Sequence, residues 1–215
     1  MEFNCLISDI DNTLADPSER LKRSLSDLGR PDVYEKTSDS FGGFAEYLSS
    51  EEMDEFWSSF LSEKYLHTDR PAPGAADFLN EVRSKRVELF YLTGRHDESG
   101  DSMRTGTVDW LRANGFPDPE EPGVELFMKP TRKEDDKEYK RSLLKERLSP
   151  RLTEQNVVGF GDHPDDAEAY EAGGVRPILL DWLGLFSREK LLAAGSDVLV
   201  VESWAEIEKE FTKSK

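Results

Sequence analysis

Residues 3–13 read FNCLISDIDNT, and this stretch decides how the rest of the chain is interpreted. It begins with a short apolar run bounded by polar residues, which predicts a buried strand over Phe3–Ser8. Asp9 and Asp11 follow, and because one residue separates them at the carboxyl end of that strand, their side chains point to the same side of the backbone. Holding two carboxylates together is costly unless a cation or a shared proton compensates the charge. The pair therefore predicts a nucleophile and an acid/base group that act with Mg²⁺, which carboxylates bind together with a substrate phosphate.

The composition describes an acidic protein of 215 residues with a net charge of −17. Such a charge repels long polyanions and argues against extended nucleic-acid binding, which needs a basic surface. A small phosphate ester can still enter a local positive pocket, so we expect a small-molecule phosphate ester as the partner. The sequence predicts no particular oligomeric state.

Three features of the sequence predict the compartment. The single cysteine, Cys5, excludes an intramolecular disulfide and fits a reducing environment. Residues 1–30 lack a basic start followed by an apolar run, so no signal peptide is expected. No apolar stretch approaches the ~20 residues needed to cross a bilayer. We therefore expect a cytoplasmic protein without membrane contact.

Short apolar runs alternate with segments of helical periodicity along most of the chain. This alternation predicts an α/β fold, a three-layer α/β/α Rossmann-like arrangement with a parallel sheet covered on both faces. Right-handed crossovers then bring the carboxyl ends of the strands to one edge, where such sheets bind ligands. The predicted strands are Phe3–Ser8, Val87–Leu92, Val124–Phe127, Val157–Phe160 and Val175–Leu180, with a sixth candidate at Val198–Val201. The predicted helices are Gly74–Lys85, Ser102–Asn114, Lys137–Leu148, Pro164–Ala172 and Trp204–Phe211.

Residues 15–72 interrupt the alternation directly after the carboxylate pair. Helical patterns dominate this segment, at Ser18–Leu28 and Phe44–Leu66. We interpret it as a helical cap insertion over the sheet edge, and residues 1–14 with 73–215 as the core domain. Substrate specificity is expected to reside in the insertion, although its sequence carries no recognisable motif.

Two further groups of polar residues follow predicted strands. Thr93 and Gly94 come directly after the second strand, and a hydroxyl beside a glycine and exposed N–H groups predicts a cradle for an anion. Asp162 and Asp166 follow the fourth strand and are expected to complete the Mg²⁺ site, although an aspartate there also suits the start of a helix. A cation to hold a phosphate oxygen is expected from either Lys129 or Lys140, although lysines of amphipathic helices usually face solvent.

Several other side chains allow two interpretations. Arg95, next to the proposed anion cradle, and Arg104 could clamp a second substrate anion, or Arg95 could pair with a nearby acid. Phe56, Trp57 and Phe60 fall on neighbouring helical positions of the insertion. They are expected to pack the insertion together, or one of them lines the substrate pocket as a stacking platform.

Taken together, these residues resemble the motifs of the haloacid dehalogenase superfamily of hydrolases. The first motif, Asp-x-Asp-x-Thr, is matched by Asp9, Asp11 and Thr13, the second by Thr93, and the fourth, Gly-Asp-x-x-x-Asp, by Gly161, Asp162 and Asp166. Around the lysine the pattern is similar to the phosphatase module of polynucleotide kinase-phosphatases and to related bacterial acid phosphatases. That similarity favours Lys140, whereas Lys129 followed by Pro130 matches other branches of the superfamily.

The resemblance implies a mechanism with an aspartyl-phosphate intermediate. Asp9 would attack phosphorus, and Asp11 would protonate the leaving oxygen and later deprotonate a water. Thr93 and the lysine would bind the phosphoryl oxygens, with Gly94 and Arg95 also expected to bind substrate. Mg²⁺ would be held by the Asp9 carboxylate, the Asp11 carbonyl group and Asp162, with Asp166 acting through water or through the other ligands.

The predicted function is therefore a Mg²⁺-dependent phosphomonoester phosphatase that acts on a small phosphorylated metabolite or a nucleotide. Asp11 separates it from the dehalogenase branch, whose halide leaving group needs no proton. One alternative is a polynucleotide-end phosphatase of the same chemistry. Another is a non-catalytic protein that binds a phosphorylated ligand on the same scaffold.

Overall fold

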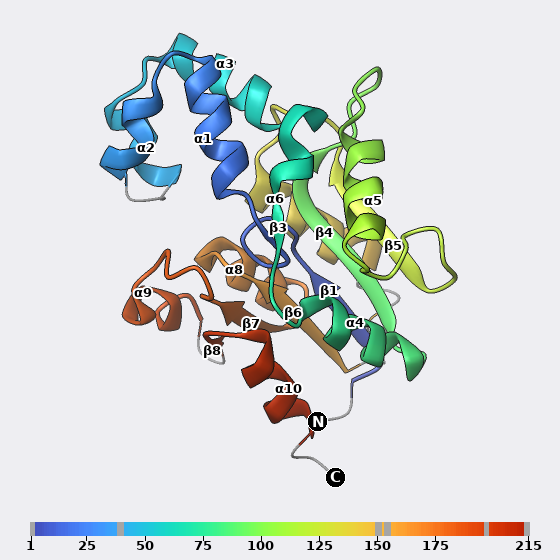
Figure 1. The fold of residues 1–215 in the computed structure, drawn as a ribbon. Helices are drawn as coiled ribbons and strands as arrows, with labels where there is room; N and C mark the ends of the chain where they lie inside the picture. Colours follow the sequence, from blue (N-terminus) through green and yellow to red (C-terminus); the bar gives the residue numbers. More distant parts are fainter. Residues whose placement is uncertain (1–2, 38–40, 149–151, 153–155, 196–197, 213–215) are drawn as a thin grey trace.

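A six-stranded parallel sheet forms the centre of the molecule (Figure 1). The computed structural model describes residues 3–37, 41–148, 152, 156–195 and 198–212. The strands follow the order β5-β4-β1-β6-β7-β8, so the strand that carries the two aspartates, β1, lies inside the sheet between β4 and β6. Their bounds are Cys5–Ser8 for β1, Glu88–His96 for β4, Val124–Lys129 for β5, Val157–Gly161 for β6, Arg176–Leu180 for β7 and Leu199–Val201 for β8.

Helices cover both faces of this sheet, which confirms the predicted three layers. Leu6 of β1 belongs to a core that includes α4 (Ala75–Ser84), α5 (Met103–Ala113) and α10 (Trp204–Thr212), which lie in front of the sheet in Figure 1. Its neighbours Cys5 and Ile7 belong to a second core. That core includes residues of α8 (Pro164–Ala172) and of a π-helical turn at Leu143–Leu148, which continues α6 (Asp136–Ser142). Because successive strand residues point to opposite faces, one apolar run serves both cores.

The strand and helix positions agree with the sequence prediction except at a few places. β4 continues beyond Leu92 to His96, because Thr93 and His96 pair with β5 across a register shift. The short helices α2 (Pro31–Thr37) and α9 (Arg188–Leu192) were not predicted, since seven and five residues give too little periodicity to detect.

Residues between β1 and α4 form a separate helical layer at one end of the molecule (Figure 1). They include α1 (Ser18–Asp27), α2, and α3 (Ser50–Phe60), and 3-10 helices at Phe41–Glu46 and Glu63–Thr68. The helix predicted over Phe44–Leu66 is thus three shorter pieces. The break before α3 has a local cause, because Ser49 and Glu52 form a reciprocal capping box that starts a new helix.

This layer has a hydrophobic core of its own and two chain connections that run together. Leu21 and Leu25 of α1 pack with Phe56 and Phe60 of α3. The connections β2 (Ala15–Asp16) and β3 (Arg70–Pro71) pair as antiparallel strands, and Arg70 forms an ion pair of 2.8 Å with Asp16. The chain therefore leaves and re-enters the core at one place. No helix among the described residues is both long and apolar enough to cross a membrane.

Leu191 and Leu192 provide a matched test of how α9 packs against the sheet. Leu191 is 0 % exposed and contacts a cluster with Leu179 and Val200, whereas Leu192 is 47 % exposed. Leu191→Ala is expected to lower the free energy of unfolding by about 2–5 kcal/mol through lost burial and a cavity. Leu192→Ala, on the same helix, is expected to change it by less than about 0.5 kcal/mol. Urea unfolding measures both values, and equal losses would contradict this packing.

Candidate active site

A cavity of about 910 Å³ lies where the carboxyl ends of four strands meet the helical layer. Its lining includes Asp9 and Asp11 after β1, Thr93 and Gly94 at the end of β4, and Lys129 at the end of β5. Further lining residues are Lys140 of α6, Asp162 and Asp166 after β6, and Asp54, Trp57 and Phe60 of α3. The structure thus brings the residues predicted from separate strand ends into one place, with Arg95 as the exception.

The backbone fixes Asp9 firmly at the end of β1. The Asp9 N–H donates to the carbonyl of Phe160 at 2.8 Å, and its carboxylate accepts from the Ile10 N–H at 2.8 Å. The chain then turns sharply, since Asn12 has a left-handed φ of 58° and the N–H groups of Leu14 and Ala15 both donate to the Ile10 carbonyl. This turn leaves the Asp9 and Asp11 side chains at the cavity.

Lys140 is the cation that lies against Asp9. Its Nζ is 3.2 Å from an Asp9 oxygen, 3.2 Å from Asp136 and 2.7 Å from Asp166, and the side chain is 2 % exposed. Lys129, the alternative, is also buried at the cavity, but its Nζ donates to the carbonyl of Glu134 at 2.9 Å. The position of Lys140 beside the predicted nucleophile supports it as the phosphate-binding lysine.

Asp166 caps a helix, which is one of the two roles that the sequence left open, and it also bonds Lys140. One carboxylate oxygen accepts from the N–H groups of Asp162 and His163, which caps the start of α8, and the other accepts from Lys140. The backbone approaches closely here: a Cβ on Gly161 would lie 2.5 Å from an Asp166 oxygen, and one on Gly94 would lie 2.7 Å from Asp136. Glycine is therefore required at both positions for the carboxylates to pack around Lys140.

Three carboxylates, from Asp9, Asp136 and Asp166, contact the ammonium of Lys140, and a carboxylate oxygen of Asp162 lies within 4.8 Å of those of Asp9 and Asp166. Burial raises the pKa of Asp9 to about 8, against the effect of Lys140 and with further repulsion from Asp166. Burial likewise raises the pKa of Asp162 well above its ordinary value. The charge of the site is therefore incompletely compensated by the chain.

The donor set fits a hard divalent cation. Asp9, Asp162 and Asp166 each offer a carboxylate oxygen, and these atoms lie within 4.8 Å of one another. All three are buried, and oxygen donors of this kind are the ligands that Mg²⁺ prefers. A bound cation would supply the charge compensation that one lysine does not.

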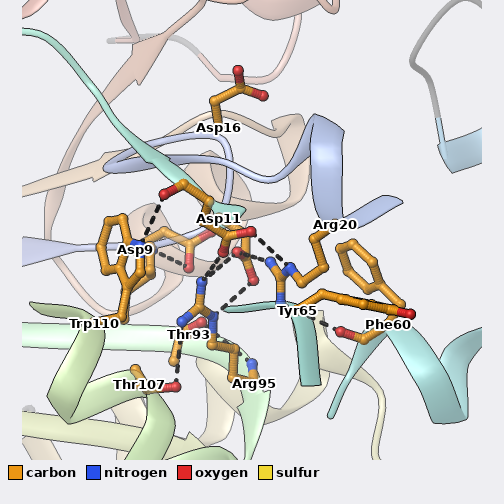
Figure 2. Close-up of polar contacts among 12 residues, drawn as sticks. Asp9, Asp11, Asp16, Arg20, Phe60, Tyr65, Thr93, Arg95, Thr107 and Trp110 are labelled. Atoms are coloured by element: carbon orange, nitrogen blue, oxygen red, sulfur yellow. Dashed lines mark hydrogen bonds and ion pairs between the residues drawn. The ribbon is translucent and has the colours of Figure 1, made fainter. Parts of the chain in front are cut away.

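Asp11 belongs to a second ionic group, and Figure 2 shows Arg20 and Arg95 converging on its carboxylate. Its carboxylate accepts from Arg20 of α1 and from Arg95 of β4, the latter at 2.7 Å and 3.1 Å. The two guanidinium groups also contact Asp69, at 3.1 Å and 3.0 Å. Although burial opposes ionisation, Arg20 and Arg95 hold the pKa of Asp11 well below its usual range.

The place of Arg95 decides between its two interpretations. The side chain is fully buried, bonds Asp11 and Asp69, and donates to the Thr107 hydroxyl at 3.3 Å. Arg95 is not among the described residues that line the cavity. Its position therefore favours the second interpretation, in which it pairs with acids of the chain. Arg104 pairs with Asp97 on the surface at 3.0 Å, and its side chain is 43 % exposed. Neither arginine faces the cavity as the sequence had allowed.

The aromatic residues of α3 fulfil both interpretations that the sequence left open, packing within the helical layer and lining the cavity. Phe56 is fully buried in the core of the helical layer. Trp57, which is half-buried, and Phe60 both belong to the cavity lining. The guanidinium of Arg20 lies 4.2 Å from the centre of the Phe60 ring. Aromatic residues of the helical layer therefore line the same cavity as the predicted nucleophile.

Three residues of the site were missed by sequence reasoning. Arg20 and Asp69 lie in the helical layer, among many charged residues of similar spacing, and no pattern marks them. Asp136 lies in the acidic run 134–136, which is typical of a solvated surface. Only the tertiary structure brings these side chains to the cavity and to Asp11.

Comparisons with known proteins agree with this geometry. A 1.7 Å crystal structure named "Putative Phosphatase" from Clostridium difficile is similar at a TM-score of 0.69, with 15% identity, over 98% of this chain and 99% of that one. A haloacid dehalogenase-like family hydrolase from Streptococcus pneumoniae gives a TM-score of 0.68, with 18% identity, over 97% and 98% of the two chains. The chain has the haloacid dehalogenase-like fold. The resemblance seen in the motifs is confirmed at the level of this fold.

The comparison of the sequence with curated proteins gives a more limited result. A Bacillus cereus protein named "Putative nucleotidase" is 32% identical over 115 residues, which cover 51% of this chain and 58% of that protein. The matched segment is therefore little more than half of either protein. No protein-family model matches the chain.

The raised pKa of Asp9 predicts how the metal-free protein responds to pH. A carboxyl whose pKa rises on folding from 3.8 to about 8 stabilises the fold fully below the lower pKa, and this contribution is lost as pH rises through about 8. In a chelator, the unfolding temperature of the wild type is expected to fall relative to that of Asp9→Asn between about pH 5 and about pH 8. Thermal unfolding of both proteins measures the difference. Parallel curves across this range would contradict the raised pKa.

Proposed function

We propose that this protein is a Mg²⁺-dependent phosphomonoester phosphatase that acts through an aspartyl-phosphate intermediate. The observation that carries the proposal is the position of Asp9 at the carboxyl end of the central strand β1. There it lies beside Lys140 and within 4.8 Å of the carboxylates of Asp162 and Asp166. A carboxylate held there by its backbone can attack a phosphorus atom, because the neighbouring cations offset the negative charge of the phosphoryl oxygens.

In the first half-reaction Asp9 forms a bond to phosphorus while the bond from phosphorus to the leaving oxygen breaks. Asp11 gives a proton to that oxygen. Because Arg20 and Arg95 keep Asp11 ionised in the free protein, Asp11 must first take up this proton from solvent when the substrate binds. In the second half-reaction Asp11 takes a proton from a water, the water oxygen bonds to phosphorus, and the bond to Asp9 breaks. The product is inorganic phosphate, and Asp9 and Asp11 return to their starting states.

The transferred phosphoryl group would be held by groups that already face the cavity. Lys140 and the Thr93 hydroxyl, with the backbone at Gly94, would bind its oxygens, where negative charge is greatest. The Asp9 and Asp162 carboxylates and the Asp11 carbonyl group would hold Mg²⁺, with Asp166 supporting them. The ion, when bound, neutralises phosphate and carboxylate charge so that the two can approach.

We assign residues 15–72 to a cap that selects the substrate. Trp57 and Phe60 support this assignment, since they bring apolar surface from the helical layer to the cavity that contains the nucleophile. The 32% identical relative named as a nucleotidase supports a nucleotide among the small esters, and an aromatic face suits a base. The charge of −17 argues against a polynucleotide end as the substrate. We also infer that the protein acts in the cytoplasm, which is supported by a single, buried cysteine that has no second cysteine in the chain for a disulfide.

The direct test is phosphate release from a panel of monoesters, nucleotides included, with and without Mg²⁺. Wild-type protein is expected to release phosphate only with Mg²⁺. Asp9→Asn is expected to abolish release, because an amide cannot attack phosphorus. Phosphate release that persists in Asp9→Asn would refute the nucleophile. Binding of a phosphorylated ligand without turnover of any ester would favour the non-catalytic alternative.

Arg20 is expected to hold Asp11 in the position that acid catalysis requires. Arg20→Lys keeps the charge, but a single ammonium cannot bridge Asp11 and Asp69 as the planar guanidinium does. An alkyl phosphate needs a proton on its leaving oxygen, whereas p-nitrophenyl phosphate does not. We expect kcat to fall about 10²-fold or more for the alkyl ester, within the usual range of general acid catalysis, and much less for the aryl ester.

Arg23→Lys is the matched control for this experiment, because Arg23 lies on the same helix and pairs with Glu19 on the surface. It is expected to leave both esters unaffected. An equal loss on the two esters in Arg20→Lys would show that Arg20 only supports the fold of the helical layer.

A further inference from the structure

The last residue of β5 and the loop that follows it contribute three cations to the cavity lining. Lys129, Arg132 and Lys133 all belong to the lining. Within the described part of the chain, none of them is within ion-pair distance of a carboxylate. Lys137, from the same stretch, shows the contrast, because it pairs with Asp165 at 3.0 Å and also with Glu168. In a protein of net charge −17, three such cations in the lining of one cavity indicate a binding role.

Lys129 is the unusual member of this group because it is buried. Its exposed fraction is 6 %, and the one hydrogen bond found for its Nζ among the described residues goes to the Glu134 carbonyl. An ammonium has three donors, so two remain for a ligand. Burial lowers the pKa of Lys129, which reflects the cost of holding this charge away from water. An anion in the cavity would offset that cost.

The fold holds Lys129 in place before any ligand arrives. It is the last residue of β5 and pairs with His96 of β4, and its carbonyl accepts from the Asp97 N–H at 2.7 Å. The hydrogen bond to Glu134 closes the loop on the other side. Its ammonium therefore has a defined position that requires little ordering on binding.

Lys129 is also distinct from the lysine at the nucleophile. Lys140 uses its ammonium on Asp9, Asp136 and Asp166, whereas no contact of Lys129 with those three carboxylates is found in the described structure. The cavity thus has one cation at the reacting phosphoryl group and three more on the β5 side, where the acidic residues 134–136 also belong to the lining. Its volume of about 910 Å³ suits a small ligand that spans both.

We propose that Lys129, with Arg132 and Lys133, forms a second anion subsite, and that the substrate is a phosphate monoester that carries a second anionic group. The second group is a phosphate or a carboxylate, which share the chemistry that an ammonium and a guanidinium recognise. This inference rests on the proposed phosphatase function for the first phosphate.

The test compares pairs of esters that differ only in the second anion. Fructose 6-phosphate with fructose 1,6-bisphosphate, and adenosine 5′-monophosphate with adenosine 3′,5′-bisphosphate, test a phosphate. Glycerol phosphate with phosphoglycerate tests a carboxylate. Wild-type protein is expected to prefer the two-anion member of at least one pair in kcat/KM by about tenfold to a hundredfold, the range of a hydrogen bond to a charged group.

Lys129→Gln is expected to remove most of that preference, mainly through KM, and Lys129→Arg to restore it. Lys145→Gln, which removes an equal charge from an exposed residue outside the cavity lining, is the matched control and is expected to keep the preference. A preference that survives in Lys129→Gln would overturn the proposal. So would a fall in kcat of equal size on both members of every pair, because Lys129 would then act on the transferred phosphoryl group.

Direct binding separates this proposal from the proposed function. In the Asp9→Asn background, calorimetry of the same pairs is expected to show tighter binding of the two-anion member, and Lys129→Gln is expected to remove the difference. This readout needs no turnover, so it holds even if wild-type protein releases no phosphate. Equal dissociation constants for both members of all three pairs would overturn the subsite.

Discussion

The crowding of buried carboxylates around one ammonium is the constraint on which the site depends. Parallel strands bring their carboxyl ends to one edge, and in this chain β1 and β6 both end in aspartates. The resulting repulsion is met by Lys140 and by backbone N–H groups that donate to Asp9 and Asp166. Glycines at the ends of β4 and β6 permit the close approach. Placing these charges together lowers the stability of the fold, and such clusters of ionisable groups are typical of functional sites. The arrangement therefore supports the proposed binding of a cation and an anionic ligand.

The neighbouring ionic group differs because its charges balance. Arg20 and Arg95 face Asp11 and Asp69, two cations against two anions, with both arginines fully buried. Such a group is stable only while every member is present, since removing one leaves a buried charge without a partner. Arg20 comes from the helical layer and Arg95 from the sheet. The acid/base candidate Asp11 is thereby held by residues of the helical layer and of the sheet at once.

Sequence reasoning located most of the core and much of the site. The alternation of apolar runs and helical periods predicted the sheet and its covering helices, because burial on both faces leaves a strong pattern. It failed at α2 and α9, which are too short for periodicity, and at the end of β4, where pairing with β5 extends the strand into the anion cradle. The helical layer was divided wrongly because a local capping box at Ser49 interrupts an otherwise continuous pattern.

The sequence by itself determined which residues stand at the strand ends, since Asp9, Thr93 and Asp162 each follow an apolar run directly. It also determined the acidic charge, which argues against long polyanions as ligands. Tertiary structure alone decided the partners. It placed Lys140 against Asp9 and Lys129 elsewhere in the cavity lining, and it brought Arg20 to Asp11. These choices depend on how α6 and α1 pack across the sheet edge, and contacts between elements distant in the chain leave no local pattern to detect.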